Sequence, residues 1–353
     1  MQASARLPST TIPLRTHYYH HHGNNRIPPK LHAFSSQAPV DEGEVDPMTG
    51  DVISGTSMAT FASNFVSTPS GHRWAYRCAD VASKSSSPEQ QQHKLPVVCI
   101  HGLGSSSYAY RNVIRLLGDA GHEAIALDWL GHGASDKPLP SQSIDYSIDT
   151  HMREFDHAMR AVLSNTKLAL VVHGYILSHI AMLWASQNPD IVSKLIIMNT
   201  PLSLKSKLRP ELAAYKAPLA FMRPKPDAQF DGGLFAAAGG PYAMASKDAQ
   251  AYDAPYQRDH PAASVVIHKT MEQLDFPGLL TRVDEEFRGW RDPGLCIHGG
   301  ADTFIELKNP LEWLESKRTC MKMAKVEAKI GHCPHEDYPE AVVPVILDFL
   351  TQD

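Results

Sequence analysis

One stretch of the chain, residues 167–178, limits its possible folds more than any other. It reads K-L-A-L-V-V-H-G-Y-I-L-S, an apolar run that ends at a glycine and leads into the helical pattern of residues 180–185. A continuous apolar run is typical of a strand buried in a parallel sheet whose two faces are covered by helices. A strand that turns this sharply into a helix can present a nucleophile on a strained bend. We therefore expect an α/β protein with its chemistry near this bend.

The bend has no serine, cysteine or aspartate at its apex, although the usual signature is G-x-S-x-G. Counting forward from the strand places Gly174 at the apex, whereas counting back from the end of the helix places Tyr175 there. The two counts differ by one residue, so we expect a one-residue insertion in the turn. Ser178 is the nearest hydroxyl, but it lies one helical turn further on. We interpret Ser178 as a helix residue that packs against the sheet.

Composition favours a globular chain with a small-molecule partner. Its 353 residues are 43% hydrophobic and 20% charged, with a formal net charge of -5, so there is no basic surplus for nucleic acid. The number of cysteines is odd, and Cys99 and Cys296 lie in apolar runs, which fits a reducing compartment. No apolar run approaches the eighteen or so residues needed to cross a bilayer. We expect neither a metal nor a cofactor.

The N-terminal part has the composition of a targeting segment. Residues 1–40 contain no acidic residue, and the basic residues Arg6, Arg15, Arg26 and Lys30 stand among Ser, Thr, His and Pro. This pattern is typical of an organelle transit peptide. The alternative is a disordered tail without an address, which would leave the protein in the cytoplasm. Residues 41–70 remain polar, and we interpret them as a disordered linker.

A second apolar strand, residues 96–100, runs into the small-residue loop His101-Gly102-Leu103-Gly104. Glycine allows the close backbone approach that a hole for a developing negative charge requires. The pattern then predicts a helix over 111–121, a strand over 123–128 and the turn D-x-x-G-x-G-x-S from Asp128 to Ser135. We assign that turn a structural role.

Two further loops follow strands near the C-terminus. Asp302 comes after the apolar strand at 294–299, where a lone carboxylate could equally cap a turn or a helix. His332 lies in the loop G-H-C-P-H-E, between a strand at 323–329 and a final helix at 341–350. Its alternative is a surface histidine. We expect His335 and Glu336 to cap the final helix.

A long insertion separates two of the strands. About ninety residues pass between the strand at 194–201 and the strand that begins at 294, more than an ordinary connection needs. The segment must therefore be a subdomain, with helical patches at 210–221 and 268–276.

Taken together, the loop at 101–104, residues 128–138 and 145–151, and the strand at 170–173 resemble the haloalkane dehalogenase and epoxide hydrolase branch of the α/β-hydrolase superfamily. They look closest to plastid-targeted, dehalogenase-like hydrolases of plants and algae, which carry a bend of the form V-V-Q-G-F-L-V-G. The resemblance implies a mostly parallel central sheet with helices on both faces and an inserted helical cap. The core would comprise 71–201 and 294–353, the cap 202–293, and the organelle would be a plastid before a mitochondrion.

The resemblance also implies roles for single residues. Gly174 stands where dehalogenases carry the attacking aspartate, and Tyr175 where they carry the tryptophan that holds the halide. Asp302 and His332 would be the acid and the base of a catalytic triad. The N–H groups of Leu103 and of Tyr175 or Ile176 would form the oxyanion hole. Substrate contacts would come from His101, Tyr252 and Tyr256, although the two tyrosines could serve only to pack the cap.

Three functions remain open at this point. The first is hydrolysis of a small apolar substrate, an ester, epoxide or haloalkane, in which His332 and Asp302 activate water. The second is a catalytically inactive member of the fold that binds a ligand or acts as a scaffold. The third is covalent chemistry by Tyr175, and nothing in the sequence would lower the phenol pKa from about 10.

Overall fold

The computed structural model describes residues 63–79, 94–141, 143–163, 166–240, 243–257, 261–317, 320–326 and 329–352. The predicted transit peptide and most of the predicted linker lie outside these residues. Strand β1 (Asn64–Ser67) lies inside the range that we assigned to a disordered linker. The folded domain therefore begins before residue 71, because β1 pairs with β2 (Arg73–Cys78) and forms the edge of the sheet.

The prediction of a mostly parallel sheet is confirmed. Eight strands follow the order β1-β2-β4-β3-β5-β6-β7-β8, and only β1 and β2 run antiparallel to their neighbours. The other strands are β3 (Val97–Ile100), β4 (Ala124–Leu127), β5 (Leu168–His173), β6 (Val192–Met198), β7 (Gly294–Gly299) and β8 (Met321–Val326). Strand β5, from which the bend emerges, pairs with β3 and β6 and so lies in the middle of the sheet.

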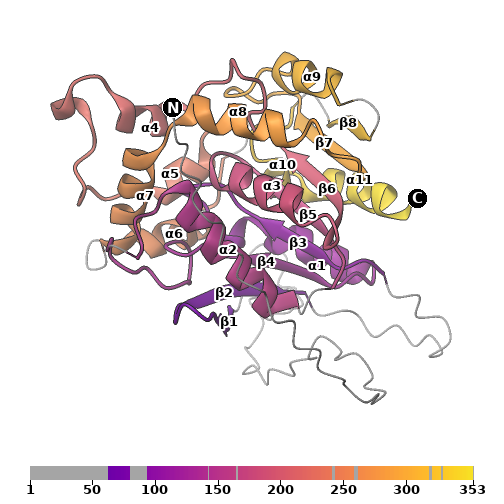
Figure 1. Ribbon diagram of the computed structural model, residues 1–353, viewed down its shortest axis with the longest axis horizontal. Coiled ribbons are helices and arrows are strands. Elements are labelled where there is room, and N and C mark those ends of the chain that lie inside the picture. Colours follow the sequence, from indigo (N-terminus) through magenta and orange to yellow (C-terminus); the bar gives the residue numbers. More distant parts are fainter. Residues whose placement is uncertain are drawn as a thin grey trace, which may run out of the picture. The chain divides into compact units, whose positions relative to one another are not determined.

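Helices cover both faces of the sheet. Alternate residues of each strand point to opposite sides, so apolar side chains on both faces need to be covered. On β3, Val97 and Cys99 pack with helices α1 (Arg111–Asp119) and α11 (Pro339–Thr351). Val98 and Ile100 face the other cluster, to which α2 (Ile148–Leu163), α3 (Leu177–Gln187), α8 (Phe276–Glu286) and α9 (Lys308–Glu315) contribute. Helices α2, α3 and α8 lie side by side across this face (Figure 1).

The segment between β6 and β7, for which we keep the name cap, is largely helical. It contains α4 (Pro210–Ala213), α5 (Gly232–Ala237), α6 (Ser246–Asp253) and α7 (Ala262–Gln273), with short 3₁₀ turns η4 (Ala214–Lys216), η5 (Ala220–Met222) and η6 (Ala254–Tyr256). Helix α8 belongs to the same stretch of sequence but packs against α3 of the core. The cap that we placed at 202–293 therefore ends before α8. The helix predicted at 210–221 is mostly 3₁₀ turns and coil, and the one predicted at 268–276 ends at 273.

Two short elements complete the chain near the cap. They are η3 (Ser107–Tyr110), which leads into α1, and α10 (Pro334–Asp337), which leads into α11.

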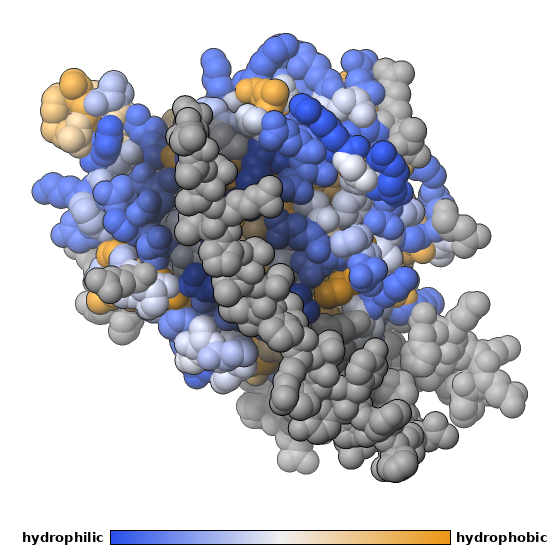
Figure 2. All heavy atoms as spheres, viewed as in Figure 1, coloured by the Kyte–Doolittle hydropathy of each residue, from blue (hydrophilic) through white to orange (hydrophobic). Residues whose placement is uncertain are grey.

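None of the described helices is long and apolar enough to cross a membrane. All five cysteines are free, and Cys99 and Cys296 are buried in the sheet. Figure 2 shows one face of the molecule, on which apolar residues are scattered among polar ones and one apolar group projects near α4.

Candidate active site

The bend between β5 and α3 consists of Gly174, Tyr175 and Ile176. The backbone is left-handed at Gly174, with φ 84°, and again at Ile176, with φ 66° and ψ −71°. The N–H of Leu177 donates to the carbonyl oxygen of Tyr175 at 2.8 Å, which closes a γ-turn around Ile176. Positive φ is strained for a β-branched residue. The strained residue of the bend is thus Ile176. Our two counts placed the apex at Gly174 and at Tyr175, which both precede it.

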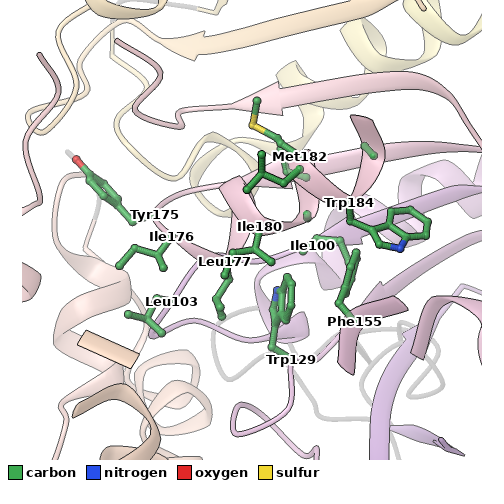
Figure 3. Close-up of a cluster of buried hydrophobic side chains, with 14 of the residues drawn as sticks. Ile100, Leu103, Trp129, Phe155, Tyr175, Ile176, Leu177, Ile180, Met182 and Trp184 are labelled. Carbon is green, nitrogen blue, oxygen red and sulfur yellow. The ribbon is translucent and has the colours of Figure 1, made fainter. Parts of the chain in front are cut away.

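No side chain at this bend is placed to attack a substrate. The Ile176 side chain is fully buried beside Leu177 and Ile180, as Figure 3 shows. Ser178 is also fully buried, and its hydroxyl donates to the carbonyl oxygen of Gly174 at 2.6 Å. Tyr175 belongs to the same buried cluster and is 2% exposed, and burial raises its pKa above that of a free phenol. The neutral phenol argues against covalent catalysis by Tyr175.

The predicted oxyanion hole is largely closed by hydrogen bonds within the protein. The N–H of Leu103 donates to the carbonyl oxygen of Tyr175 at 2.9 Å, and the N–H of Ile176 donates to Nδ1 of His179 at 3.0 Å. Gly102 allows this approach, because a Cβ there would lie 2.7 Å from the Tyr175 nitrogen. Leu103 and Ile176 are therefore wrong as oxyanion donors. Within the described residues, the Tyr175 N–H alone of the three has no acceptor.

The loops after β7 and β8 bring Asp302 and His332 together. Nδ1 of His332 donates to Oδ2 of Asp302 at 2.9 Å, and both side chains are almost completely buried. Burial disfavours the charged carboxylate, but the hydrogen bonds from His332 and from neighbouring donors hold the pKa of Asp302 below its ordinary value. Those donors include the backbone N–H groups of Phe304 and Ile305. The ionised acid thus fixes one tautomer of the imidazole and leaves Nε2 as an acceptor.

Asn199 supports this pair, and sequence reasoning missed it. It follows β6 with a positive φ of 35°. Its Nδ2 donates to Oδ2 of Asp302 at 2.7 Å, while its Oδ1 accepts from the N–H of Gly299 at 3.0 Å. The side chain therefore joins the ends of β6 and β7 at the acid. The available signal was a lone amide immediately after a buried strand.

A pocket opens where the cap meets these loops. Its empty volume is about 410 Å³ when the open solvent at its mouth is counted. His332 lines it, and Nε2 of His332 makes no hydrogen bond to a described residue. The other lining residues come from the β3 loop, the bend, the cap and the loop around α10: Gly102, Leu103, Ser105, Ala109, His173, Gly174, Tyr175, Arg209, Phe235, Ala236, Tyr252, Cys333, His335 and Glu336.

Comparisons with known proteins place this arrangement in a family. The family model described as alpha/beta hydrolase fold matches residues 96–292, which is more than half of the chain. The chain belongs to the α/β-hydrolase fold family. Among its relatives, a haloalkane dehalogenase of Mycolicibacterium paratuberculosis is 31% identical over 219 residues, or 60% of this chain and 68% of the relative. This hydrolase-fold protein therefore falls in the haloalkane dehalogenase-like branch.

Other relatives match over a shorter stretch. A cis-3-alkyl-4-alkyloxetan-2-one decarboxylase of Shewanella oneidensis is 34% identical over 105 residues, and a haloalkane dehalogenase of Agrobacterium fabrum is 36% identical over 98 residues. The matched regions cover 32% and 30% of those two proteins. A solved haloalkane dehalogenase from Bradyrhizobium elkani superposes with a TM-score of 0.65 at 18% identity and covers 82% of this chain and 97% of its own. That likeness shows the α/β-hydrolase fold.

The structure separates the three residues that we expected to contact substrate in this hydrolase-fold protein. Tyr252 lines the pocket, and its hydroxyl donates to Glu336 at 2.5 Å. His101 is fully buried outside the pocket lining, because its Nδ1 donates to the carbonyl oxygen of Gly102 and its Nε2 accepts from the N–H of Trp129. Tyr256 is likewise buried inside the cap, 5.0 Å from the ring of Phe230. His101 and Tyr256 are packing residues.

His335 and Glu336 do not cap the final helix, which begins at Pro339. Glu336 forms a bidentate pair with Arg111 at 2.7 and 2.6 Å, and Arg111 also reaches Asp248 of the cap at 3.2 Å. His335 stacks on Tyr110 with ring centroids 4.6 Å apart, and burial lowers its pKa to about 3. The expected capping role is wrong because both side chains turn inward. Within the described part of the chain, no group of three or more His, Cys, Asp or Glu could hold a metal.

Proposed function

We propose that this protein is a hydrolase in which His332, oriented by Asp302, acts as a general base on water in the pocket. The observation that carries the proposal is the 2.9 Å hydrogen bond between the two buried side chains. That bond leaves Nε2 of a pocket-lining histidine without a partner among the described residues. A base must lie within reach of the proton that it removes, and Nε2 is placed to do so for a water beside it.

The mechanism uses direct attack by water. Nε2 of His332 accepts a proton from the water as its oxygen bonds to the electrophilic carbon, and Asp302 stabilises the resulting imidazolium. The imidazolium then returns the proton to the departing oxygen. General-base catalysis of this kind supplies a factor of about 10² to 10⁴ in rate. The substrate must therefore be reactive, such as an activated ester or an epoxide.

The dehalogenase relatives suggest small apolar substrates, but their mechanism does not carry over in full. The strained residue of the bend is Ile176, and neither it nor the preceding Gly174 and Tyr175 carries a carboxylate that could displace a halide. We infer that ester or epoxide hydrolysis is favoured over dehalogenation. The relatives named as dehalogenases and as a decarboxylase are enzymes, so the comparisons give the non-catalytic alternative no support.

The test compares turnover of p-nitrophenyl esters, epoxides and haloalkanes by the native protein and by His332→Ala and Asp302→Asn. We expect both variants to lose turnover by about 10² or more. His72→Ala provides the matched control, because His72 lies in the turn between β1 and β2, at the edge of the sheet. Equal turnover in all four proteins would refute the mechanism. An acyl adduct in the intact mass during turnover would refute direct attack by water.

We also propose that residues 1–40 direct the protein to a plastid, on the basis of their lack of acidic residues and their scattered arginines. A fluorescent protein fused behind these residues should enter plastids in plant cells. A fusion in which the four basic residues are replaced by glutamine should stay in the cytoplasm. Cytoplasmic fluorescence from the unaltered fusion would contradict the proposal.

A further inference from the structure

The cap contributes a buried cation to the pocket. Arg209 is only 3% exposed, yet its side chain lines the pocket. Its Nε donates to Glu211 at 2.9 Å, and its Nη2 donates to the carbonyl oxygen of Phe235 at 2.9 Å. Nη1 makes no hydrogen bond to a described residue. A buried guanidinium therefore keeps unused donors at the edge of the pocket, which is unusual for so costly a group.

Aromatic rings fix the position of this guanidinium. Its central carbon lies 3.6 Å from the ring centroid of Phe235 and 4.3 Å from that of Phe304. The ring of Phe304 in turn meets the His332 imidazole edge to face at 5.1 Å. Phe304 thus contacts both the cation and the base. Arg209 belongs to the same site as His332 although it comes from a different part of the chain.

Few other donors in the pocket can meet a negative charge. The N–H groups of Leu103 and Ile176 already donate within the protein, which leaves the N–H and the buried hydroxyl of Tyr175, neither of which has a partner among the described residues. His335 also lines the pocket, is 1% exposed and has a buried Nδ1 without a partner. Unpartnered polar groups of Tyr175 and His335 and a cation with spare donors therefore surround one small space.

We propose that Arg209 makes this pocket a binding site for an anionic ligand, specifically for the carboxylate of a small organic acid or half-ester. A guanidinium binds a carboxylate through short, charge-assisted hydrogen bonds, and burial strengthens them. The substrate class of the proposed hydrolase is then a half-ester whose free carboxylate contacts Arg209 while its ester faces His332. The inference rests on the proposed function for that last step only, because carboxylate binding requires no turnover.

Removal of Glu211 and removal of Arg209 should change anion binding in opposite directions, which tests the proposal. This carboxylate neutralises Arg209 through Nε. Its removal should strengthen anion binding, whereas removal of the guanidinium should weaken it. If Arg209 merely anchors the cap through Phe235 and Glu211, neither variant should change carboxylate binding selectively.

Calorimetric titration with monomethyl glutarate and with neutral dimethyl glutarate provides the measurement. We expect Arg209→Met to weaken binding of the monoanion at least tenfold and to leave the diester unchanged, because a charge-assisted bond is worth at least that factor. Arg209→Lys should retain part of the affinity, and Glu211→Gln should increase it. Equal monoanion binding by the native protein and Arg209→Met would overturn the proposal, as would an equal loss for both ligands.

The hydrolase proposal and the anion-binding proposal can be refuted independently of each other. The control variant His72→Ala should bind the monoanion with native affinity, and the selectivity between the monoanion and the diester is a binding measurement that does not depend on catalysis. Should Arg209→Met not fold, the response of Glu211→Gln decides the matter, and a monoanion affinity equal to that of the native protein would overturn the proposal. Loss of ester turnover in His332→Ala together with unselective binding would leave the hydrolase standing and remove the anion site.

Discussion

Acidification should unfold this protein at an unusually high pH, because many of its histidines are buried in the neutral form. Burial disfavours the imidazolium, and the pKa falls to about 4 in His151 and His179 and to about 3 in His335. The buried histidines with a lowered pKa include these six: His101, His132, His151, His173, His179 and His335.

The magnitude follows from proton linkage. An unfolded histidine titrates near 6.5, so below that pH the unfolded chain binds protons that the folded chain excludes. A lowered pKa in the folded state means that stability is complete above pH 6.5 and declines as the pH falls toward the folded value. Between pH 7 and pH 5.5 each of His151, His179 and His335 removes about 1.2 kcal/mol, so these three remove roughly 4 kcal/mol, and the other three lower the stability further. A typical domain has only about 5 to 15 kcal/mol in total.

One carboxyl group works in the opposite direction. Burial, followed by the neighbouring Glu336, raises the pKa of Asp337 to about 6, so its protonation favours the folded state as the pH falls through that value. A single group offsets only part of the effect of six. We therefore expect unfolding between about pH 5 and pH 6, above the range in which carboxylates usually cause acid denaturation.

Far-ultraviolet circular dichroism across pH 4 to 8, with urea midpoints at pH 7 and pH 5.5, provides the assay. The urea midpoint should fall steeply between these two values. His335→Phe is the matched variant, because His335 stacks on Tyr110 and its buried Nδ1 has no partner, so a ring without a proton site replaces it. This variant should unfold at a lower pH than the native protein. A native protein with equal urea midpoints at pH 7 and pH 5.5 would refute the reasoning.

Three further predictions concern the bend and the cap. Gly102→Ala should cost about 1 to 3 kcal/mol, since the new Cβ would lie 2.7 Å from the Tyr175 nitrogen, and an unchanged urea midpoint would contradict this. At Ile176 the glycine variant should be more stable than the alanine variant by about 1 to 3 kcal/mol, because φ is positive there. At Ile180, inside α3, we expect the reverse order by about 1 kcal/mol, and the same order at both positions would rule out strain. Tyr252→Phe removes a hydrogen bond to a carboxylate of α10 and should lower the urea midpoint by an amount worth about 1.5 to 3 kcal/mol, so a midpoint at the native value would show that the bond contributes nothing.

The sequence predicted the scaffold well because buried strands leave a strong local pattern. Strands β3, β5, β6 and β7 are apolar runs followed by glycine or a polar residue, and the order of acid and histidine near the C-terminus fits one edge of a parallel sheet. The hydrogen bond between Asp302 and His332 is the geometry that this order implied. Its catalytic role stays a prediction.

What the sequence could not predict depends on contacts between distant backbone groups. Nothing local shows that the Leu103 N–H donates to Tyr175, because that bond forms only when the β3 loop meets the bend. The position of strain at Ile176 depends on where α3 begins, and element ends are poorly marked by composition. Arg209 is one arginine among several in the cap. Only the folded arrangement sets it beside Phe304 and the pocket.

A backbone hydrogen bond joins the cap to the loop that contains His332. The N–H of His332 donates to the carbonyl oxygen of Gly239 at 2.9 Å, and Gly239 lies so close to Phe304 that a Cβ there would come within 2.3 Å of the ring. A movement of the cap that widens the pocket entrance must break this hydrogen bond. It must also displace the Phe304 ring, which packs against His332. Widening of the pocket by a movement of the cap and the position of the His332 backbone are therefore coupled through this one hydrogen bond.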